Sequence, residues 1–335
     1  MEIGSSNDGR RATIMVTNDD GIEAPGLQAL VQVLVSTKRY VVQVCAPDSE
    51  KSGVSHSTTC LHPISVKQVE IQGTTAFAVS GTPADCVSLG VSKAIFPSIP
   101  DLPINLTNVD VSLLVTSYNN IYIFLNFVCE QVISDINKGN NYAYNIVYSG
   151  TVAGTREAFV YGVPSISISY YWAPNKSQNN DFKLSAMLCL PIISKILENI
   201  KNQTYTDGCF LNIDLPTNIA NHKGYKLTKQ GRNMHKFWWK QITSQENTTD
   251  QLLFEKQLGH FFFVETKEND NSPVEANSTS WVFRRVSNNQ VDDKEDTDKT
   301  FLRQGYITIT SLGALSCADK ESHAFFKDWL PKCIQ

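Results

Sequence analysis

Short apolar runs alternate with helical patterns along the first part of the chain. Residues 13–16 form a β-rich apolar run, and residues 27–34 then place Leu and Val at helical spacing. Further apolar runs cover residues 41–46 and 76–79. These runs are continuous rather than alternating, as in strands that helices cover on both faces. The pattern therefore predicts strands and helices in alternation, which is typical of a parallel α/β sheet.

Capping signals locate two helices more closely. Thr82 can cap a helix, Pro83 fits its first position, and Asp85 completes the spacing of a capping box. A second helix is predicted to begin at Ser149 and to end near Gly162. Both predictions depend only on residues close to the helix ends.

The alternation continues through the rest of the chain. Val132 and Ile133 lead into a turn-rich stretch at 134–144. The other predicted elements are strands at 165–170, 210–213, 225–227 and 306–310, a helix at 182–200 that Pro191 disturbs, and a terminal helix at 318–330. Residues 241–300 are polar and irregular, and we interpret them as long hairpins or loops.

Composition narrows the class of protein. The 335 residues are 41% hydrophobic and 19% charged, which supports a sizeable core and excludes global disorder. A net charge of −4 does not favour polymeric nucleic acid as a partner. The eight cysteines are scattered without a CxxC motif, so zinc-ribbon and redox motifs are absent. The N-terminus lacks an apolar signal region, and the apolar run at 121–129 is far shorter than a membrane span, so we expect a cytoplasmic protein.

Unusual polar residues gather at the predicted strand ends, where open α/β sheets bind ligands. Asp19 and Asp20 are adjacent carboxylates on a tight turn, and a hard divalent cation would offset their repulsion. A hydroxyl at 49–53 could bind the same cation, and an Asn at 137–141 could complete an oxygen cage. Each segment alone could equally be an ordinary turn or loop, because Asp, Ser, Asn and Gly are all turn formers.

The segment 149–154 is rich in hydroxyl groups and glycine at a predicted helix start, which suits a phosphate. It is not a Walker A motif, because it lacks the GK[ST] ending. The chain also lacks a GxGxxG motif after the first strand and a GxSxG elbow, which argues against dinucleotide-binding dehydrogenases and α/β-hydrolases. A cation that faces an anion-binding helix start suits metal-assisted hydrolysis of a phosphate ester without a covalent nucleophile.

Five ordered motifs resemble the SurE (survival protein E) family. They are VTNDDGIEAPGL, APDSEKSGVSHS, VSGTPADCV, INKGNN and YSGTVAGTREAF. The resemblance covers roughly residues 12–335 and is strongest over 12–95 and 132–172. It implies a divalent-metal-dependent phosphatase that acts on nucleoside monophosphates. The implied fold is a Rossmann-like three-layer α/β/α sandwich with a C-terminal hairpin and helix extension.

The resemblance also implies site residues and an assembly. The implied metal ligands, for one Mg²⁺ or Mn²⁺, are Asp19, Asp20, Ser52 and Asn137. The implied phosphate pocket is Ser149, Gly150 and Thr151, with Asn18 nearby. We assign Asp20 as the group that accepts a proton from the attacking water. Residues 1–11 would be a flexible tail, 12–200 the catalytic core and 201–335 a part that completes it. Within that part, 241–300 and 318–330 would build a homodimer or homotetramer.

Two departures from the family pattern bear on activity. The family's SGIN motif has Asp135 in place of its Gly, which would strain the backbone if that position holds a positive φ. Asp135 also adds a third carboxylate, which could tighten cation binding or repel the phosphate. The second departure is an apolar insertion near 117–131, which is a gene-model error or a loop at the sheet edge.

Three functional interpretations follow. The first is hydrolysis of nucleoside 5′- or 3′-monophosphates to nucleoside and phosphate. The second is a catalytically impaired protein that binds nucleotides or assembles with intact homologues, because of Asp135 and the insertion. The third is an acid phosphatase of broad specificity.

Overall fold

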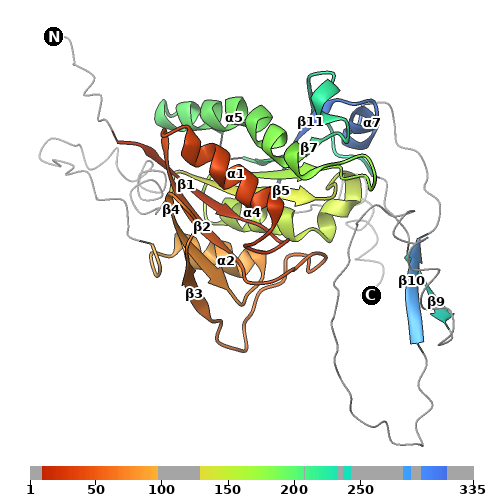
Figure 1. Ribbon diagram of the computed structural model, residues 1–335, viewed down its shortest axis with the longest axis horizontal. Coiled ribbons are helices and arrows are strands. Elements are labelled where there is room, and N and C mark those ends of the chain that lie inside the picture. Colours follow the sequence, from red (N-terminus) through yellow and green to blue (C-terminus); the bar gives the residue numbers. More distant parts are fainter. Residues whose placement is uncertain are drawn as a thin grey trace, which may run out of the picture.

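A single mixed sheet organises the chain, as the computed structural model shows (Figure 1). The structure describes residues 10–96, 129–206, 208–232, 237–242, 282–287 and 296–314. The nine strands lie in the order β3-β4-β2-β1-β5-β6-β7-β11-β8. Their bounds are β1 Ala12–Thr17, β2 Tyr40–Pro47, β3 Val66–Val69, β4 Thr74–Val79, β5 Gln131–Lys138, β6 Ser165–Tyr170, β7 Phe210–Leu215, β8 Tyr225–Thr228 and β11 Ile307–Leu312.

The centre of the sheet is parallel and its margins are mixed. Strands β4, β2, β1, β5, β6 and β7 pair in parallel. At one margin β3 is antiparallel to β4, and at the other β11 is antiparallel to β7 and parallel to β8. A separate antiparallel hairpin pairs β9 (Phe237–Ile242) with β10 (Val282–Ser287).

Helices cover both faces of the sheet. Helices α1 and α5 pack together on one face, and α2 and α4 pack together on the other (Figure 1). Their bounds are α1 Pro25–Ser36, α2 Pro83–Val91, α4 Gly150–Val160 and α5 Asn179–Lys201, with short helices η2 Ala143–Val147, η3 Ile219–Asn221 and α7 Asp298–Arg303. The three-layer α/β arrangement that the sequence predicts is therefore confirmed.

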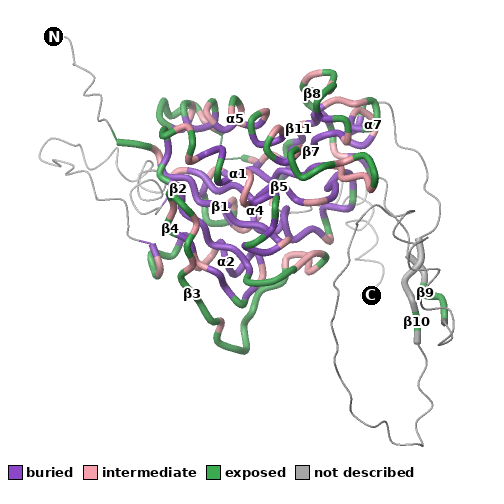
Figure 2. Tube along the Cα trace, viewed as in Figure 1, coloured by how far each residue is buried: buried purple, intermediate pink, exposed green. Residues whose placement is uncertain are grey.

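Two apolar clusters, one on each face, hold the layers together. The larger lies under α1 and α5 and includes Leu27, Leu34 and Ile193. The smaller lies under α2 and α4 and includes Met15 and Val87. Figure 2 shows the central strands buried along their lengths, whereas β3 at the margin is exposed. Burial on both faces explains why the central strands read as continuous apolar runs.

Local signals in the sequence account for the helix ends. The capping box of α2 is present, because the Thr82 hydroxyl accepts from the Asp85 N–H and the Asp85 carboxylate accepts from the Thr82 N–H. The Ser149 hydroxyl caps α4 by accepting from the Val152 N–H. Helix α5 runs on through Pro191, which lies on the exposed side of the helix, so the disturbance that the sequence predicts does not end the helix.

Strand β5 differs most from the prediction. The turn-rich interpretation of 134–144 is wrong at its start, because β5 continues to Lys138. Polar side chains hide this strand in the sequence, although β1 and β6 pair with it on both sides. Gln131, at the end of the predicted insertion, is the first residue of β5. The remaining insertion residues at 117–128 and the predicted helix at 318–330 lie outside the described residues.

The strand order identifies where a ligand can enter. From β1 the chain moves outward through β2 to β4, and it then returns to place β5 on the opposite side of β1. The loops after β1 and β5 therefore leave the sheet in opposite directions. In open α/β sheets this switch point opens a crevice at the carboxyl ends of the two strands.

Candidate functional site

Two adjacent carboxylates occupy the switch point. Asp19 and Asp20 follow Asn18, the first residue after β1, and the turn closes at Gly21 with φ of +95°. A side chain on Gly21 would also lie 3.2 Å from the backbone carbon of Ser49 in the loop after β2. Glycine is therefore required here both by its positive φ and by the close approach of a second loop.

Asp19 links the first strand to helix α4. Its side chain is buried, with 3% of the residue exposed. The Thr151 hydroxyl donates to Asp19 Oδ1 at 2.7 Å. The backbone carbonyl of Asp19 accepts a hydrogen bond from the Lys51 N–H at 2.6 Å, so the loop that carries Ser52 is also held at Asp19. A Cβ on Gly150 would lie 2.7 Å from Asp19 Cβ, so only glycine fits at the first position of α4.

Asp20 links the same turn to strand β5. The Lys138 N–H donates to Asp20 Oδ2 at 2.9 Å. Asn137 precedes Lys138 and is buried near the end of β5. The structure thus brings the chain segments of Asp19, Asp20, Ser52 and Asn137 to one edge of the sheet.

The electrostatics of this edge disfavour negative charge on its carboxyl groups. Burial raises the pKa of Asp19 to about 6, and the charge of Glu50 adds to the shift. Burial also raises the pKa of Asp20 well above its usual value, with further contributions from Asp19 and Glu50. A bound cation would relieve this cost and favour the ionised carboxylates.

Asn18 is oriented by its neighbours. Its Nδ2 donates to the Gly21 carbonyl at 2.7 Å and to Asp135 Oδ2 at 3.3 Å. Because the Gly21 carbonyl can only accept a hydrogen bond, the amide nitrogen of Asn18, and not its oxygen, must face this carbonyl. Asn18 Oδ1 is buried and has no hydrogen-bond partner among the described residues. The side chain therefore offers an acceptor to whatever enters the site.

Asp135 lies behind this edge, fully buried in β5. The register between β5 and β6 shifts at this residue, which marks a β-bulge. Its φ is not positive, so the expected left-handed strain is absent. Its carboxylate accepts from Asn18 Nδ2 and from the Ile136 N–H. Burial raises its pKa well above the usual value, and the charge of Asp20 adds to the shift.

The segment Ser149, Gly150 and Thr151 begins helix α4 beside Asp19. The helix N-terminus supplies the positive end of the helix dipole, while the Val152 N–H donates to Ser149 and the Thr151 N–H faces Asp19. All three residues are buried. This end of α4 is suited to an anion, next to carboxylates that are suited to a cation.

The donor set fits a hard cation. Carboxylate, hydroxyl and carboxamide oxygens are the ligands that Mg²⁺ and Mn²⁺ prefer. The unpartnered Asn18 Oδ1 is one structural sign that a donor or cation belongs here. No group of three or more His, Cys, Asp or Glu side chains is arranged to hold a metal within the described ranges.

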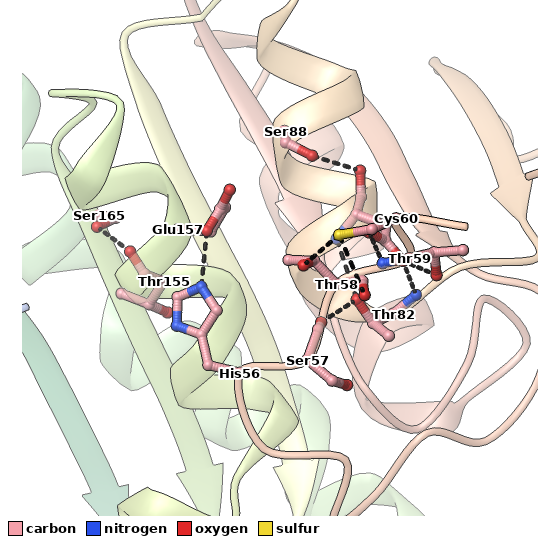
Figure 3. A network of polar contacts seen from close by, with 11 residues as sticks. His56, Ser57, Thr58, Thr59, Cys60, Thr82, Ser88, Thr155, Glu157 and Ser165 are labelled. Carbon is pink, nitrogen blue, oxygen red and sulfur yellow. Dashed lines mark hydrogen bonds and ion pairs between the residues drawn. The ribbon is translucent and has the colours of Figure 1, made fainter. Parts of the chain in front are cut away.

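Sequence reasoning did not find the pairing of His56 with Glu157. The two side chains meet at 2.6 Å between the loop after β2 and helix α4 (Figure 3). From the sequence, His56 is interpreted as a surface residue or as a residue behind the site. The partner lies 101 residues away, so no local spacing could have identified it.

The fold and the site define a class: an α/β protein with an oxygen-rich, acidic ligand site at a sheet switch point, opposite a helix N-terminus. A family model described as Survival protein SurE matches residues 14–112 and 116–237. The chain belongs to the survival protein SurE family.

Curated relatives and a solved structure agree with this family. The chain is 30% identical to a 5′-nucleotidase SurE from Clostridium beijerinckii and 35% identical to one from Clostridium botulinum strain Loch Maree, in each case over 89% of this chain and 92% of the relative. It is also similar to the crystal structure of the Sure protein from Aquifex aeolicus. That match has a TM-score of 0.61 and 25% identity, and it covers 94% of this chain and 98% of the other.

Proposed function

We propose that this chain hydrolyses nucleoside 5′- or 3′-monophosphates to nucleoside and phosphate, with one divalent cation, Mg²⁺ or Mn²⁺. Its class, a phosphoric monoester hydrolase, follows from the family and from the relatives named 5′-nucleotidase. The observation that carries the proposal is the buried Asp19, adjacent to Asp20 and hydrogen-bonded to Thr151 at the start of α4. Cation and anion sites are thereby adjacent.

In this proposal Asp19, Asp20, Ser52 and Asn137 hold the cation. When bound, it would engage a phosphoryl oxygen and lower the pKa of a water molecule. Asp20 accepts the proton of the attacking water. It is the more exposed of the two aspartates, and the Lys138 N–H holds one of its oxygens in place.

The start of α4 binds the phosphate in this proposal. Ser149, Gly150 and Thr151 present the positive end of the helix dipole to the phosphoryl oxygens, and they stabilise the charge that develops there. Asn18 lies beside this pocket. Its free atom is the acceptor Oδ1, which suits a water molecule or a protonated phosphate oxygen.

The location and assembly remain parts of the proposal. No helix among the described residues is long and apolar enough to cross a membrane. We propose a cytoplasmic homodimer or homotetramer, assembled through residues 241–300 and 318–330.

A phosphate-release assay tests the proposal. The substrates are 5′- and 3′-nucleoside monophosphates and p-nitrophenyl phosphate, each with Mg²⁺, Mn²⁺ or EDTA. Release that requires a metal and favours nucleotides is expected. Equal rates on all esters would favour an acid phosphatase of broad specificity.

A second candidate is supported by the buried Asp135 carboxylate beside Asn18. In its ionised form, which burial disfavours, Asp135 would add a third negative charge that repels the phosphate and leaves a protein that binds nucleotides or assembles with homologues without catalysis. Calorimetry with Mn²⁺ and a nucleotide separates the two, because binding without phosphate release supports only this candidate.

A further inference from the structure

The loop between β2 and β3, residues 48–65, reaches from the site across two helices; we call it the serine loop. It carries Ser52, one of the proposed cation ligands. Near Ser52 it is tied to the site by the Lys51 N–H, which donates to the Asp19 carbonyl at 2.6 Å. Further along, the Thr59 N–H and hydroxyl donate to the Asp85 carboxylate of α2 at 2.9 and 2.6 Å.

The middle of the serine loop is strained. Ser55 has a φ of +59°, in the left-handed region that residues other than glycine rarely adopt. Such a conformation is unfavourable for a residue with a side chain and persists only where surrounding contacts enforce it. Two of these contacts come from the segment before α4. The Ser55 N–H donates to the Tyr148 carbonyl at 3.1 Å, and the Ser55 hydroxyl donates to the Val147 carbonyl at 2.6 Å.

The next residue supplies the third contact. His56 Nε2 lies 2.6 Å from Glu157 Oε2, and their side chains are only 26% and 13% exposed. The ion pairs Arg10–Glu130, Lys195–Glu198 and Lys229–Asp296 are more exposed, as in Lys195–Glu198 at 64% and 55%. A partly buried, short contact between a histidine and a carboxylate is stronger than a surface pair, because water screens it less.

Helix α4 thereby contacts both sides of the site. Its first turn carries Ser149, Gly150 and Thr151 beside Asp19, and Glu157 lies two turns further along the same helix. Figure 3 shows His56 reaching from the serine loop to Glu157 on α4, while Thr59 and Thr82 secure the loop at α2. A rigid helix can therefore set the distance between the phosphate pocket and the loop of Ser52.

We propose that His56 and Glu157 are positioning residues that hold the serine loop against α4 and so place Ser52 for cation binding. The role given to Ser52 rests on the proposed function. The contact of His56 with Glu157 that holds the loop, which we call the clamp, does not depend on that function. Without the pair, the strain at Ser55 favours release of the loop, and Ser52 moves away from Asp19 and Asp20.

Hydrogen exchange tests the clamp independently of activity. In the full-length protein, E157A and H56A are expected to speed amide exchange at Lys51 and Ser55 about tenfold, whereas E157Q, which keeps an acceptor, should have a smaller effect. E198Q, which weakens the exposed pair, is the matched control and should change nothing at these amides. Unchanged exchange at Ser55 in E157A would overturn the clamp.

Manganese titration tests the link to Ser52. Calorimetry with Mn²⁺ alone should show about tenfold weaker binding in H56A and in E157A. The double variant should be no weaker than either single variant, because the two residues act as one unit. T59V, which removes a contact of the same loop beyond His56, should bind Mn²⁺ normally. Additive losses, or unchanged affinity in both single variants, would overturn the positioning role.

Kinetics distinguish positioning from general damage to the fold. At saturating Mn²⁺ the variants should recover most of kcat, while the Mn²⁺ concentration for half-activation rises about tenfold. A kcat that stays low at every Mn²⁺ concentration contradicts the proposal. If the wild-type protein neither binds Mn²⁺ nor releases phosphate, the proposed function fails, and the exchange experiment still decides whether the clamp exists.

Discussion

Two groups of buried acids in this fold have different surroundings. Asp19, Asp20 and Asp135 gather at the β1–β5 switch point, where one carboxylate raises the pKa of the next and the nearby Asn18 Oδ1 has no hydrogen-bond partner among the described residues. Asp214 and Asp298 lie near the ends of β7 and α7, where each accepts a backbone N–H from a distant loop. We call these the site acids and the anchor acids.

The anchor acids hold loops in place. Asp214 Oδ1 accepts from the Asn141 N–H at 2.7 Å, and its Oδ2 accepts from Asn212 Nδ2 at 2.9 Å. Asp298 accepts from the Ala143 N–H at 2.9 Å and from the Gly231 N–H at 3.0 Å. Ala143 has a φ of +51°, so the Asp298 carboxylate secures a strained turn.

The site acids are crowded together instead. Asp19 and Asp20 repel one another, and their pKa values are raised by burial and by neighbouring negative charge. A carboxylate that fastens a distant loop acts structurally, whereas carboxylates that gather beside an unpartnered oxygen are the arrangement expected of a cation site. The comparison therefore yields a testable division between acids expected to stabilise the fold and acids proposed to act in function.

The largest effect that we expect is the loss of phosphate-release activity when a site acid is substituted. Asp19→Asn keeps the shape and the acceptor for Thr151 but removes the charge. We expect turnover to fall at least a hundredfold, with the free energy of unfolding unchanged or raised, because repulsion from Asp20 disappears. Phosphate release and urea unfolding measure the two quantities. Near-normal turnover in this variant would show that the charge of Asp19 is not needed for the reaction.

Substitution of an anchor acid should instead lower the free energy of unfolding. Asp298→Ala leaves the buried N–H groups of Ala143 and Gly231 without their acceptor. We expect a loss of roughly 3–5 kcal/mol in the free energy of unfolding, since each orphaned donor costs about 1–3 kcal/mol. Urea unfolding followed by circular dichroism measures it. A loss below about 1 kcal/mol would mean that the anchor acids are not structural.

The pH dependence of stability sharpens the comparison further. Burial raises the pKa of Asp214 to about 7 from 3.8, so the folded protein holds this proton more tightly than the unfolded chain. The contribution of Asp214 to the free energy of unfolding is therefore full below about pH 4. It is lost as the pH rises through 7, a change of a few kcal/mol. Asp214→Asn should flatten this slope in unfolding experiments.

Mn²⁺ provides the control for the pH experiment. The raised pKa of Asp19, about 6, gives a slope of the same sign in the metal-free protein. Saturating Mn²⁺ should remove the Asp19 part and leave the Asp214 part, because only the site acids would bind the cation. A slope that Mn²⁺ abolishes completely would contradict the division into two groups.

The smallest effect is expected at an exposed charge. Glu198→Gln weakens a surface pair with Lys195, whose atoms lie 2.9 Å apart. Such pairs contribute about 0–1 kcal/mol, so neither stability nor phosphate release should change measurably. This variant sets the baseline against which both groups of acids are compared.

Much of the fold could be predicted from local pattern. The strand at 165–170 matches β6, and the capping box at Thr82 and Asp85 is confirmed. Strand β5 was missed beyond Ile133 because Ser134, Asp135 and Asn137 read as a turn. A strand at the centre of a sheet is held by neighbours on both sides, so it tolerates polar residues that local propensity disfavours.

Long-range pairings could not be predicted. Asp298 meets Ala143 across 155 residues, and His56 meets Glu157 across 101. No spacing rule connects such residues, because their proximity depends on the order of strands in the sheet.

By itself, the sequence determined the alternation of strands and helices, the helix caps and the identity of the oxygen-bearing residues at the strand ends, because these depend on the side chains of neighbouring residues. Only the tertiary structure decided which acids gather at the switch point and which fasten loops elsewhere. That distinction depends on donors from distant segments, and the parallel order of β1 and β5 sets where those segments meet.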